Sequence, residues 1–202
     1  MTQISAQQRF ASVRARLEEL GLWDENALVM SAPGAVYSAA GEPVTTELFS
    51  AVSAPMAVLT AGRYAREFVR KPHALRAETD DAAQMFGVRV PVRSAPRRGD
   101  IACLVPGVGF IVTARFENEL IAACILLEKL CMTARLSPRI GTPKPLSAPL
   151  CLMEHAVYTK KYSRPSLAAA QGEKRVPEAQ NVPDLALRES VIAYGRKLVE
   201  NR

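Results

Sequence analysis

Residues 99–135 constrain the fold of this chain more than any other stretch of the sequence. Ile101–Val105 and Val108–Thr113 are apolar runs rich in β-branched residues, which favour strands. Pro106-Gly107 lies between them and provides the fixed φ and the positive φ that the central positions of a type II turn need. Glu117–Arg135 follows at helical length with apolar residues around most of its circumference. The stretch therefore predicts a β-hairpin followed by a long, largely buried helix.

Hydrophobic spacing predicts the other elements of one domain over residues 1–164. Helices are expected at Ala6–Leu20, Arg63–Arg70, Asp80–Phe86 (capped by Asp80 or Thr79) and Cys151–Tyr162, and strands at Ala27–Ser31, Val36–Ser38, Met56–Thr60 and Val88–Val92. Residues 137–149 contain four prolines and are expected to be irregular. Residues 165–183 have the composition of a linker, and residues 184–202 predict an amphipathic helix.

Composition excludes several classes of protein. The net charge of +6 comes from dispersed basic residues, so the clusters at Arg93–Arg98 and Lys160–Arg164 are interpreted as solvated surface and no nucleic-acid partner is predicted. A subunit contact or an anionic ligand at these clusters remains open. The N-terminus lacks a signal-peptide core, and the longest apolar run, Leu120–Leu127, is too short to cross a bilayer. We therefore expect a cytoplasmic protein with no membrane partner.

The cysteines favour buried free thiols in a reducing compartment over disulfides or zinc ligands. Each lies in an apolar run, and no pair has the spacing of a CxxC motif. They are Cys103, Cys124, Cys131 and Cys151.

Several motifs follow one another in the order seen in the class II aldolase/adducin family. Ser31–Tyr37 (SAPGAVY) is similar to that family's Thr-Pro-Ser-Gly-x-x-Tyr hairpin, and Thr45–Glu47 to its Ser-Ser-Glu segment. Asp80–Gly87 (DDAAQMFG) is similar to its Asp-Asp-x-Ala-Gln-x-x-Gly run, and residues 99–135 resemble its His-Gly hairpin and long helix. The resemblance covers Arg9–Tyr162. It implies a three-layer α/β/α fold with a central, mostly antiparallel sheet and helices on both faces.

The resemblance also implies a chemistry. Members of the family bind a divalent metal, often zinc, through a His-Thr-His motif after a buried strand and a third histidine in the His-Gly turn. The metal stabilises an enediolate, so that a carbon–carbon bond breaks or a centre epimerises. By the resemblance, Glu47 corresponds to the acid/base glutamate. The positions that hold the substrate correspond to Ser31, Gly34, Thr45 and Thr46.

The metal ligands of the family are missing from this chain. Leu59, Ala61 and Pro106 stand at the three ligand positions, and none has a side-chain nitrogen, oxygen or sulfur for a metal. The chain has two histidines, His73 and His155, which cannot form a three-histidine site and are interpreted as surface or hydrogen-bonded residues. The sequence therefore predicts no metal cofactor. Without a metal, Glu47 is interpreted as a surface or capping carboxylate.

The C-terminal segment gives a second clue. Leu187–Asn201 resembles the opening helix of a class II aldolase domain, and its apolar face carries Leu187, Val191, Tyr194 and Leu198. Three interpretations stay open: the first half of a tandem protein, a helix retained for docking, or an unrelated amphipathic helix.

The hypothesis we favour is a non-catalytic class II aldolase-like domain with a structural, regulatory or oligomer-partner role. It would act as a homo-oligomer, or as a hetero-oligomer with an active paralogue or a second domain. One alternative is an aldehyde-lyase or epimerase that acts on a small sugar phosphate and holds zinc or another divalent metal at a non-standard site, with Glu47 beside Cys or His donors. The other is a sugar-phosphate binding module that uses Arg63 or the Arg93–Arg98 loop.

Overall fold

The computed structural model describes residues 5–141 and 144–163. The helices are α1 (Ala6–Glu19), α2 (Arg63–Phe68), α3 (Asp80–Phe86), α4 (Glu117–Ile140), α5 (Ala148–Val157) and the π-helix η1 (Tyr158–Ser163). The strands are β1 (Leu28–Ala32), β2 (Ala35–Ser38), β3 (Met56–Thr60), β4 (Leu75–Arg76), β5 (Arg89–Val90), β6 (Ala102–Val105) and β7 (Gly109–Ala114). The linker expected at 165–183 and the helix expected at 184–202 lie outside the described residues.

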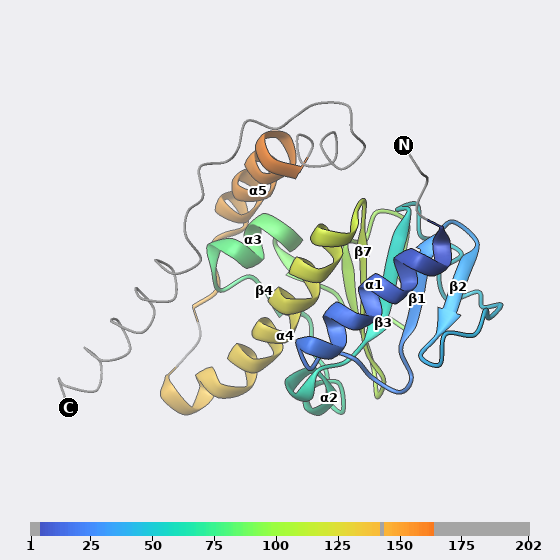
Figure 1. Ribbon diagram of the computed structural model, residues 1–202. Helices are drawn as coiled ribbons and strands as arrows, with labels where there is room; N and C mark the ends of the chain where they lie inside the picture. The colour runs from blue at the N-terminus through green and yellow to red at the C-terminus, as the bar shows by residue number, and fades with distance from the viewer. Residues whose placement is uncertain (1–4, 142–143, 164–202) are drawn as a thin grey trace. The chain divides into compact units, whose positions relative to one another are not determined.

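The central sheet has the strand order β2-β1-β3-β7-β6 in the described part of the chain (Figure 1). Each neighbouring pair in it is antiparallel, and β4 and β5 form a separate antiparallel pair. Helices α1 and α4 run across the same face of the sheet, where α1 contacts β1 and α4 contacts β3 and β7. The predicted α/β class with a mostly antiparallel sheet is confirmed.

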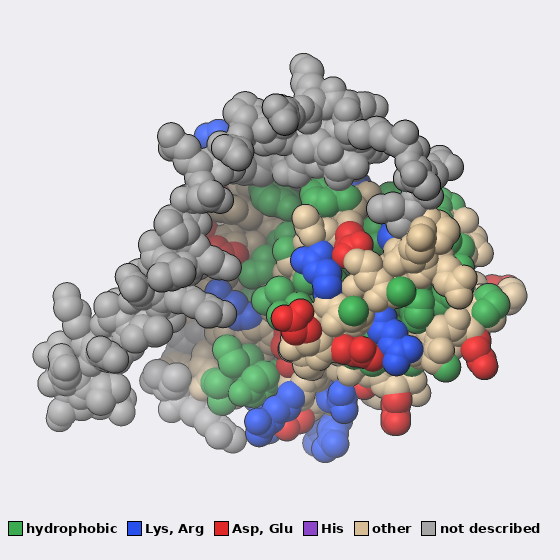
Figure 2. Space-filling view, viewed as in Figure 1, with side chains coloured by type: hydrophobic (Ala, Val, Ile, Leu, Met, Phe, Trp, Pro, Cys, Tyr) green, Lys and Arg blue, Asp and Glu red, His purple; other side chains and the backbone are tan. Residues whose placement is uncertain are grey.

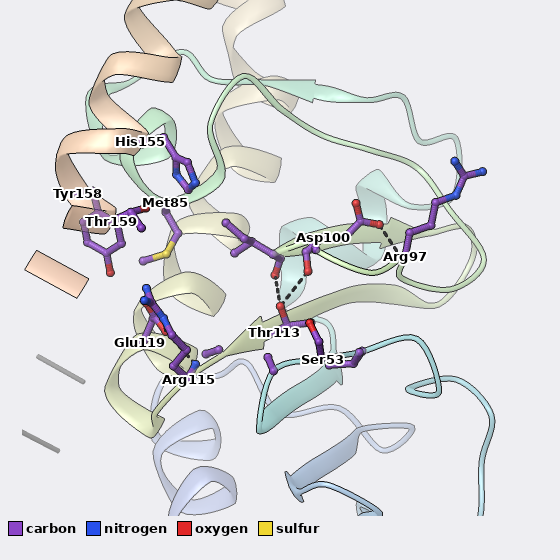
Figure 3. Close-up of a pocket in the computed structure, with 15 residues that line it drawn as sticks. Ser53, Met85, Arg97, Asp100, Thr113, Arg115, Glu119, His155, Tyr158 and Thr159 are labelled. Carbon is purple, nitrogen blue, oxygen red and sulfur yellow. Dashed lines mark hydrogen bonds and ion pairs between the residues drawn. The ribbon is translucent and has the colours of Figure 1, made fainter. Parts of the chain in front are cut away.

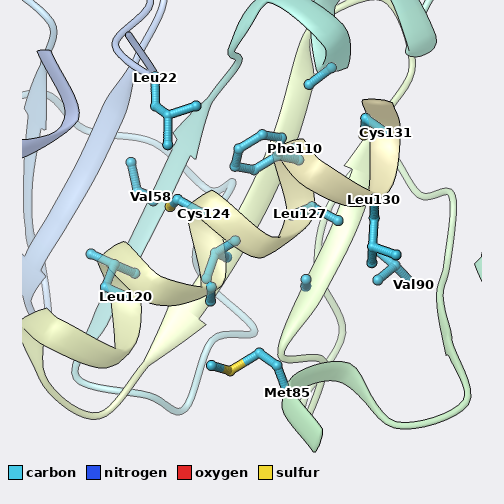
Figure 4. Packing of buried hydrophobic residues seen from close by; sticks show 14 of the residues in the cluster. Leu22, Val58, Met85, Val90, Phe110, Leu120, Cys124, Leu127, Leu130 and Cys131 are labelled. Atoms are coloured by element: carbon cyan, nitrogen blue, oxygen red, sulfur yellow. The ribbon is translucent and has the colours of Figure 1, made fainter. Parts of the chain in front are cut away.

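The core consists of two apolar clusters, one on each face of the sheet. Alternate strand residues face opposite sides: Val58 and Val112 belong to the cluster under the helices, and Ala57 and Ile111 to the other. Each described α-helix contributes to the first cluster, part of which appears in Figure 4. The second cluster is covered by the irregular segment 44–52, through Val44, Leu48, Phe49 and Val52.

The predicted hairpin and turn are confirmed. Gly107 has φ +71°, and the amide of Val108 donates to the carbonyl of Val105 at 3.1 Å, which closes the turn that contains Pro106. The amide of Gly107 donates to the carbonyl of Val69 at 2.8 Å. The tip of the hairpin is thereby attached to the end of α2.

The structure corrects part of the prediction that residues 137–149 are irregular, which holds for Gly141 and residues 144–147. Helix α4 continues past Arg135 to Ile140 with Pro138 inside it, and α5 already begins at Ala148. Pro138 removes one amide from the last turns of α4, but Gly141 still donates to the carbonyl of Ser137 at 2.9 Å. Pro149 lies in the first turn of α5, where a missing amide costs nothing.

Other boundaries shift by a few residues. Helix α2 ends at Phe68 rather than Arg70, and the strand expected at Val88–Val92 shortens to β5. Pro91 cannot donate to a ladder, although its carbonyl accepts from the amide of Leu104 at 2.9 Å. Of the two candidate caps of α3, Thr79 is the N-cap, and its hydroxyl accepts from the amide of Ala82 at 3.4 Å.

Charged side chains of both signs are interspersed on the face shown in Figure 2. On and beside α1, Arg14 pairs with Glu18 at 2.8 Å and Arg16 pairs with Glu117 at 3.2 Å. Among the described residues, none of the helices combines the length and the apolar character needed to cross a membrane.

The cysteines are free and buried, as the sequence predicts. Burial raises the pKa of Cys103 and of Cys131 to about 12, and it also raises the pKa of Cys124. A thiol with a pKa of 12 is about one part in ten thousand thiolate at pH 8, and the thiolate is the reactive form. We therefore expect iodoacetamide to leave Cys103, Cys124 and Cys131 unmodified in the folded protein and to alkylate them after denaturation. Mass spectrometry of tryptic peptides measures this, and rapid alkylation of Cys103 in the folded protein would contradict the described burial.

Candidate functional site

The end of β3 lies against the start of β7, directly after the β6–β7 turn. Leu59 pairs with Ile111 and Thr60 with Phe110 in the ladder. Gly109 passes so close to β3 that a Cβ on it would lie 2.3 Å from the carbonyl oxygen of Thr60. The two segments to which the resemblance assigns metal ligands are therefore neighbours in the structure.

The side chains at the ligand positions do not fit a metal. Leu59 is 6% exposed and belongs to the apolar cluster beneath segment 44–52, whereas Ala61 is fully buried in the cluster beneath the helices. Pro106 is exposed at the tip of the hairpin. Thr60, between the first two positions, donates its hydroxyl to the carbonyl of Leu22. Within residues 5–141 and 144–163, no three His, Cys, Asp or Glu side chains are placed to hold a metal together.

A cavity of about 490 Å³ opens beside Leu59, Gly107 and Val108. Its polar lining includes Arg66, Arg70, Glu25 and the buried Asp24. Arg66 Nε lies 3.1 Å from Asp24 Oδ2. The second oxygen of Asp24 accepts the amide of Asn26 at 2.8 Å. The charged groups that line this cavity are thus two guanidinium groups, the carboxylate of Asp24, which is already paired with Arg66, and the carboxylate of Glu25. The guanidinium groups could contact an anionic ligand.

Glu128 of α4 caps the N-terminus of α2, the helix that follows Leu59 and Ala61 in the sequence. Its carboxylate accepts the amide of Tyr64 at 2.6 Å and the amide of Ala65 at 3.2 Å, at the N-terminus of α2. A Cβ on Gly62, the N-cap residue, would lie 2.5 Å from the carboxylate carbon, so the cap requires glycine there. This contact was not predicted from the sequence, where the only sign of it is a glutamate among the apolar residues of α4. Burial raises the pKa of Glu128, although the amides and Arg66 partly oppose the rise.

The cap gives a prediction with a defined pH dependence. Glu128→Ala should cost about 2 kcal/mol of unfolding free energy, because two amides lose their acceptor. A raised pKa means that the folded state binds the proton of Glu128 more tightly than the unfolded state does. The wild type should therefore lose stability relative to Glu128→Gln as the pH rises from the unfolded pKa near 4.5 through the folded pKa. Urea titrations across this range measure it, and parallel curves for the two proteins would contradict the raised pKa.

The predicted substrate positions are only partly brought together. Gly34 and Thr46 both line a cavity of about 290 Å³. Ser31 is fully buried, and its hydroxyl has no hydrogen-bond partner among the described residues. Thr45 and Glu47 are exposed, and neither lines this cavity. The structure thus unites two of the five positions that the resemblance implies.

The remaining candidates take part in ordinary contacts. The guanidinium of Arg63 lies 5.7 Å from the ring centre of Tyr64. Arg93 Nε lies 3.0 Å from Asp100 Oδ2, so the basic loop is partly neutralised. His73 is exposed beside Phe68.

Solved structures share the fold of this chain. No family model and no curated protein sequence matches the chain. Among solved structures, an L-fuculose 1-phosphate aldolase is similar with a TM-score of 0.62 and 13% identity, over 79% of this chain and 98% of that one. YgbL of Klebsiella pneumoniae, for which an aldolase, epimerase or decarboxylase activity is suggested, has a TM-score of 0.56 and 16% identity, over 76% of this chain and 99% of that one. An L-fuculose 1-phosphate aldolase of Glaciozyma antarctica PI12 has a TM-score of 0.54 and 14% identity, over 83% of this chain and 90% of that one.

The fold of this chain is therefore class II aldolase-like. At these identities the similarity concerns the fold, and the resemblance read from the sequence is confirmed at that level.

Proposed function

We propose that this chain is a non-catalytic class II aldolase-like domain with a structural, regulatory or oligomer-partner role. The observation that carries the proposal is the packing of the ligand positions. Leu59 and Ala61 each belong to an apolar cluster of the core, and they are 6% and 0% exposed. Metal-assisted cleavage needs nitrogen, oxygen or sulfur donors at such positions, with one site left open for the substrate.

The aliphatic residues are built into the packing around them. Ala61 lies beneath the backbone of Gly109, where a Cβ would come within 3.0 Å of the alanine Cβ. A larger side chain at residue 61 would displace core residues, which costs on the order of 1–3 kcal/mol. Stability at this end of the sheet thus favours residues that cannot bind a metal.

An activity assay tests the proposal. L-Fuculose 1-phosphate is the substrate named for two of the similar structures, so cleavage of it should be measured with Zn²⁺, with Mn²⁺ and with EDTA. We expect the same rate with the protein as in buffer alone, while an L-fuculose 1-phosphate aldolase serves as the positive control. Metal-dependent cleavage that EDTA abolishes would overturn the proposal and favour the aldolase alternative.

A binding role without catalysis is the second candidate, and the cavity beside Leu59 favours it because arginines are part of its lining. Arg66 and Arg70 line about 490 Å³ of space next to Leu59. A bound sugar phosphate would raise the melting temperature, because a ligand that binds only the folded state stabilises it. Loss of that rise in Arg70→Ala, with no loss in Arg89→Ala on the exposed part of β5, would support this candidate. No rise in the wild type at millimolar L-fuculose 1-phosphate would exclude this sugar phosphate as a ligand.

The oligomer-partner role makes a separate prediction. Light scattering of the chain alone should give a mass of at least twice 22.0 kDa if it forms a homo-oligomer. If it forms a hetero-oligomer, the mass should increase once the partner is added. A 22.0 kDa species at all concentrations and with each candidate partner would restrict the role to regulation by a monomer.

A further inference from the structure

A third cavity lies at the other end of the central strands, away from Leu59 and Ala61. It measures about 250 Å³ and is lined by the residues just before β3 and by Thr113 and Ala114 at the end of β7 (Figure 3). Because β3 and β7 are antiparallel, with Met56 opposite Ala114 and Thr60 opposite Phe110, this cavity is separated from the ligand positions by the length of β3. The absence of a metal ligand therefore has no bearing on it.

His155 contributes a hydrogen-bond acceptor of fixed position to this cavity. Its Nδ1 lies 2.7 Å from the carbonyl oxygen of Gln84. A carbonyl only accepts, so Nδ1 carries the proton, and Nε2 of the neutral ring is left with a lone pair. The contact of Nδ1 with this carbonyl fixes the tautomer. The side-chain amide of Gln84 donates to Glu154 at 3.1 Å, which adds a second hydrogen bond between α3 and α5.

Arg115 contributes a cation whose orientation is fixed by Glu119. The buried carboxylate of Glu119 accepts the backbone amide of Arg115 at 2.9 Å and its Nη2 at 2.9 Å. This side-on pairing fixes the guanidinium at the cavity wall, where the Arg115 side chain remains partly exposed. An anionic group that entered the cavity would meet the guanidinium without the cost of ordering a flexible side chain.

The rest of the lining is apolar over most of its area, and its charged groups are Arg97, Asp100 and Glu119. Met85, Ile101 and Ala114 form much of the wall. The hydroxyl of Thr113 already donates to the carbonyl of Asp100 at 2.9 Å, so it offers a ligand only its acceptor capacity. A cavity of 150 Å³ holds benzene. One of about 250 Å³ therefore has room for a benzene ring with two small substituents.

The helix that borders the cavity changes its geometry there. Helix α5 gives way to the π-helix η1 at Tyr158, and both Tyr158 and Thr159 line the cavity. Such π-helical turns are rare and occur often at functional sites. This observation is independent of the cavity's size and of its polar groups.

We propose that this cavity binds a small hydroxy acid with an apolar body. The carboxylate would meet the guanidinium of Arg115, and the hydroxyl would donate to Nε2 of His155. The site does not depend on the proposed function, since neither residue belongs to the aldolase-like positions.

The test is calorimetric titration of the full chain with 4-hydroxybenzoate, which carries a carboxylate and a hydroxyl on opposite sides of a benzene ring. Benzoate lacks the hydroxyl, and phenol lacks the carboxylate. We expect one saturable site for 4-hydroxybenzoate and about tenfold weaker binding of the other two, since tenfold corresponds to about 1.4 kcal/mol, the order of magnitude of one net hydrogen bond.

His155→Phe keeps an aromatic ring and removes the acceptor. It should weaken 4-hydroxybenzoate about tenfold and leave benzoate unchanged, while His73→Phe, on an exposed histidine outside the cavity, should change neither. If His155→Phe does not fold, Ala54→Leu at the cavity wall serves instead and should abolish binding of 4-hydroxybenzoate. No saturable binding to the folded wild type up to about 5 mM, or equal affinity for all three compounds, would overturn the proposal.

Discussion

Gly109→Ala is expected to lower the free energy of unfolding by about 3 kcal/mol. The added Cβ would lie 2.3 Å from the carbonyl oxygen of Thr60 and 3.0 Å from the Cβ of Ala61. That carbonyl belongs to the backbone where β3 pairs with β7, so it cannot move aside as a flexible side chain could. Urea unfolding followed by circular dichroism measures the loss.

Gly141→Ala is the matched control for this change. A Cβ on Gly141 would meet no atom of the described residues within 4 Å, and its φ of 167° is extended backbone that any residue adopts. We expect this variant to remain within about 0.5 kcal/mol of the wild type. Equal costs for the two variants would contradict the close approach of the β6–β7 hairpin to the end of β3.

Leu127→Ala is expected to cost about 3 kcal/mol, because its side chain is fully buried in the cluster shown in Figure 4. The change removes apolar area from the core and leaves a cavity. Alanine is an excellent helix former, so the loss reports packing and not helix propensity. Thermal or urea unfolding measures it.

Ile125→Ala on the same helix provides the comparison. Ile125 is 41% exposed, so its truncation should cost less than about 1 kcal/mol. If Leu127→Ala were no more costly than Ile125→Ala, the side of α4 assigned to the core would be wrong.

Local signals in the sequence predicted the elements that form the centre of the fold. The turn between β6 and β7 needs the φ values that Pro106 and Gly107 provide. The five consecutive apolar or small residues at Met56–Thr60 suit a strand that is buried on both faces. The helix after the hairpin was predicted from its apolar residues, but its end was not. Pro138 is a helix-breaking signal that the last turns of α4 tolerate.

The contacts that shape the candidate sites were not predictable from local patterns. Glu128, which caps α2, lies 64 positions after Tyr64 in the sequence. His155 lies 71 positions after Gln84, with which it forms a hydrogen bond. Nothing near these residues in the sequence marks the partner. The ion pair between Arg66 and Asp24 is similarly remote in sequence. Long-range pairings of this kind depend on the packing of the whole domain.

The resemblance predicted neighbouring segments better than it predicted neighbouring side chains. It assigned ligand positions to the end of β3 and to the β6–β7 turn, and the structure brings these segments together. It also grouped Glu47 with Gly34 and Thr46, yet Glu47 is exposed and does not line their cavity. Topology is shared at 13–16% identity, and a similarity of this kind carries no information about side-chain chemistry.

Zinc stoichiometry tests the central claim most directly, namely that the ligand positions of the aldolase-like fold no longer hold a metal. The full chain should be incubated with excess Zn²⁺, dialysed and analysed for metal by inductively coupled plasma mass spectrometry. Because Leu59, Ala61 and Pro106 offer no donor atoms, we expect far less than about one tenth of a zinc ion per chain to remain. Retention of close to one zinc ion per folded chain would contradict the account.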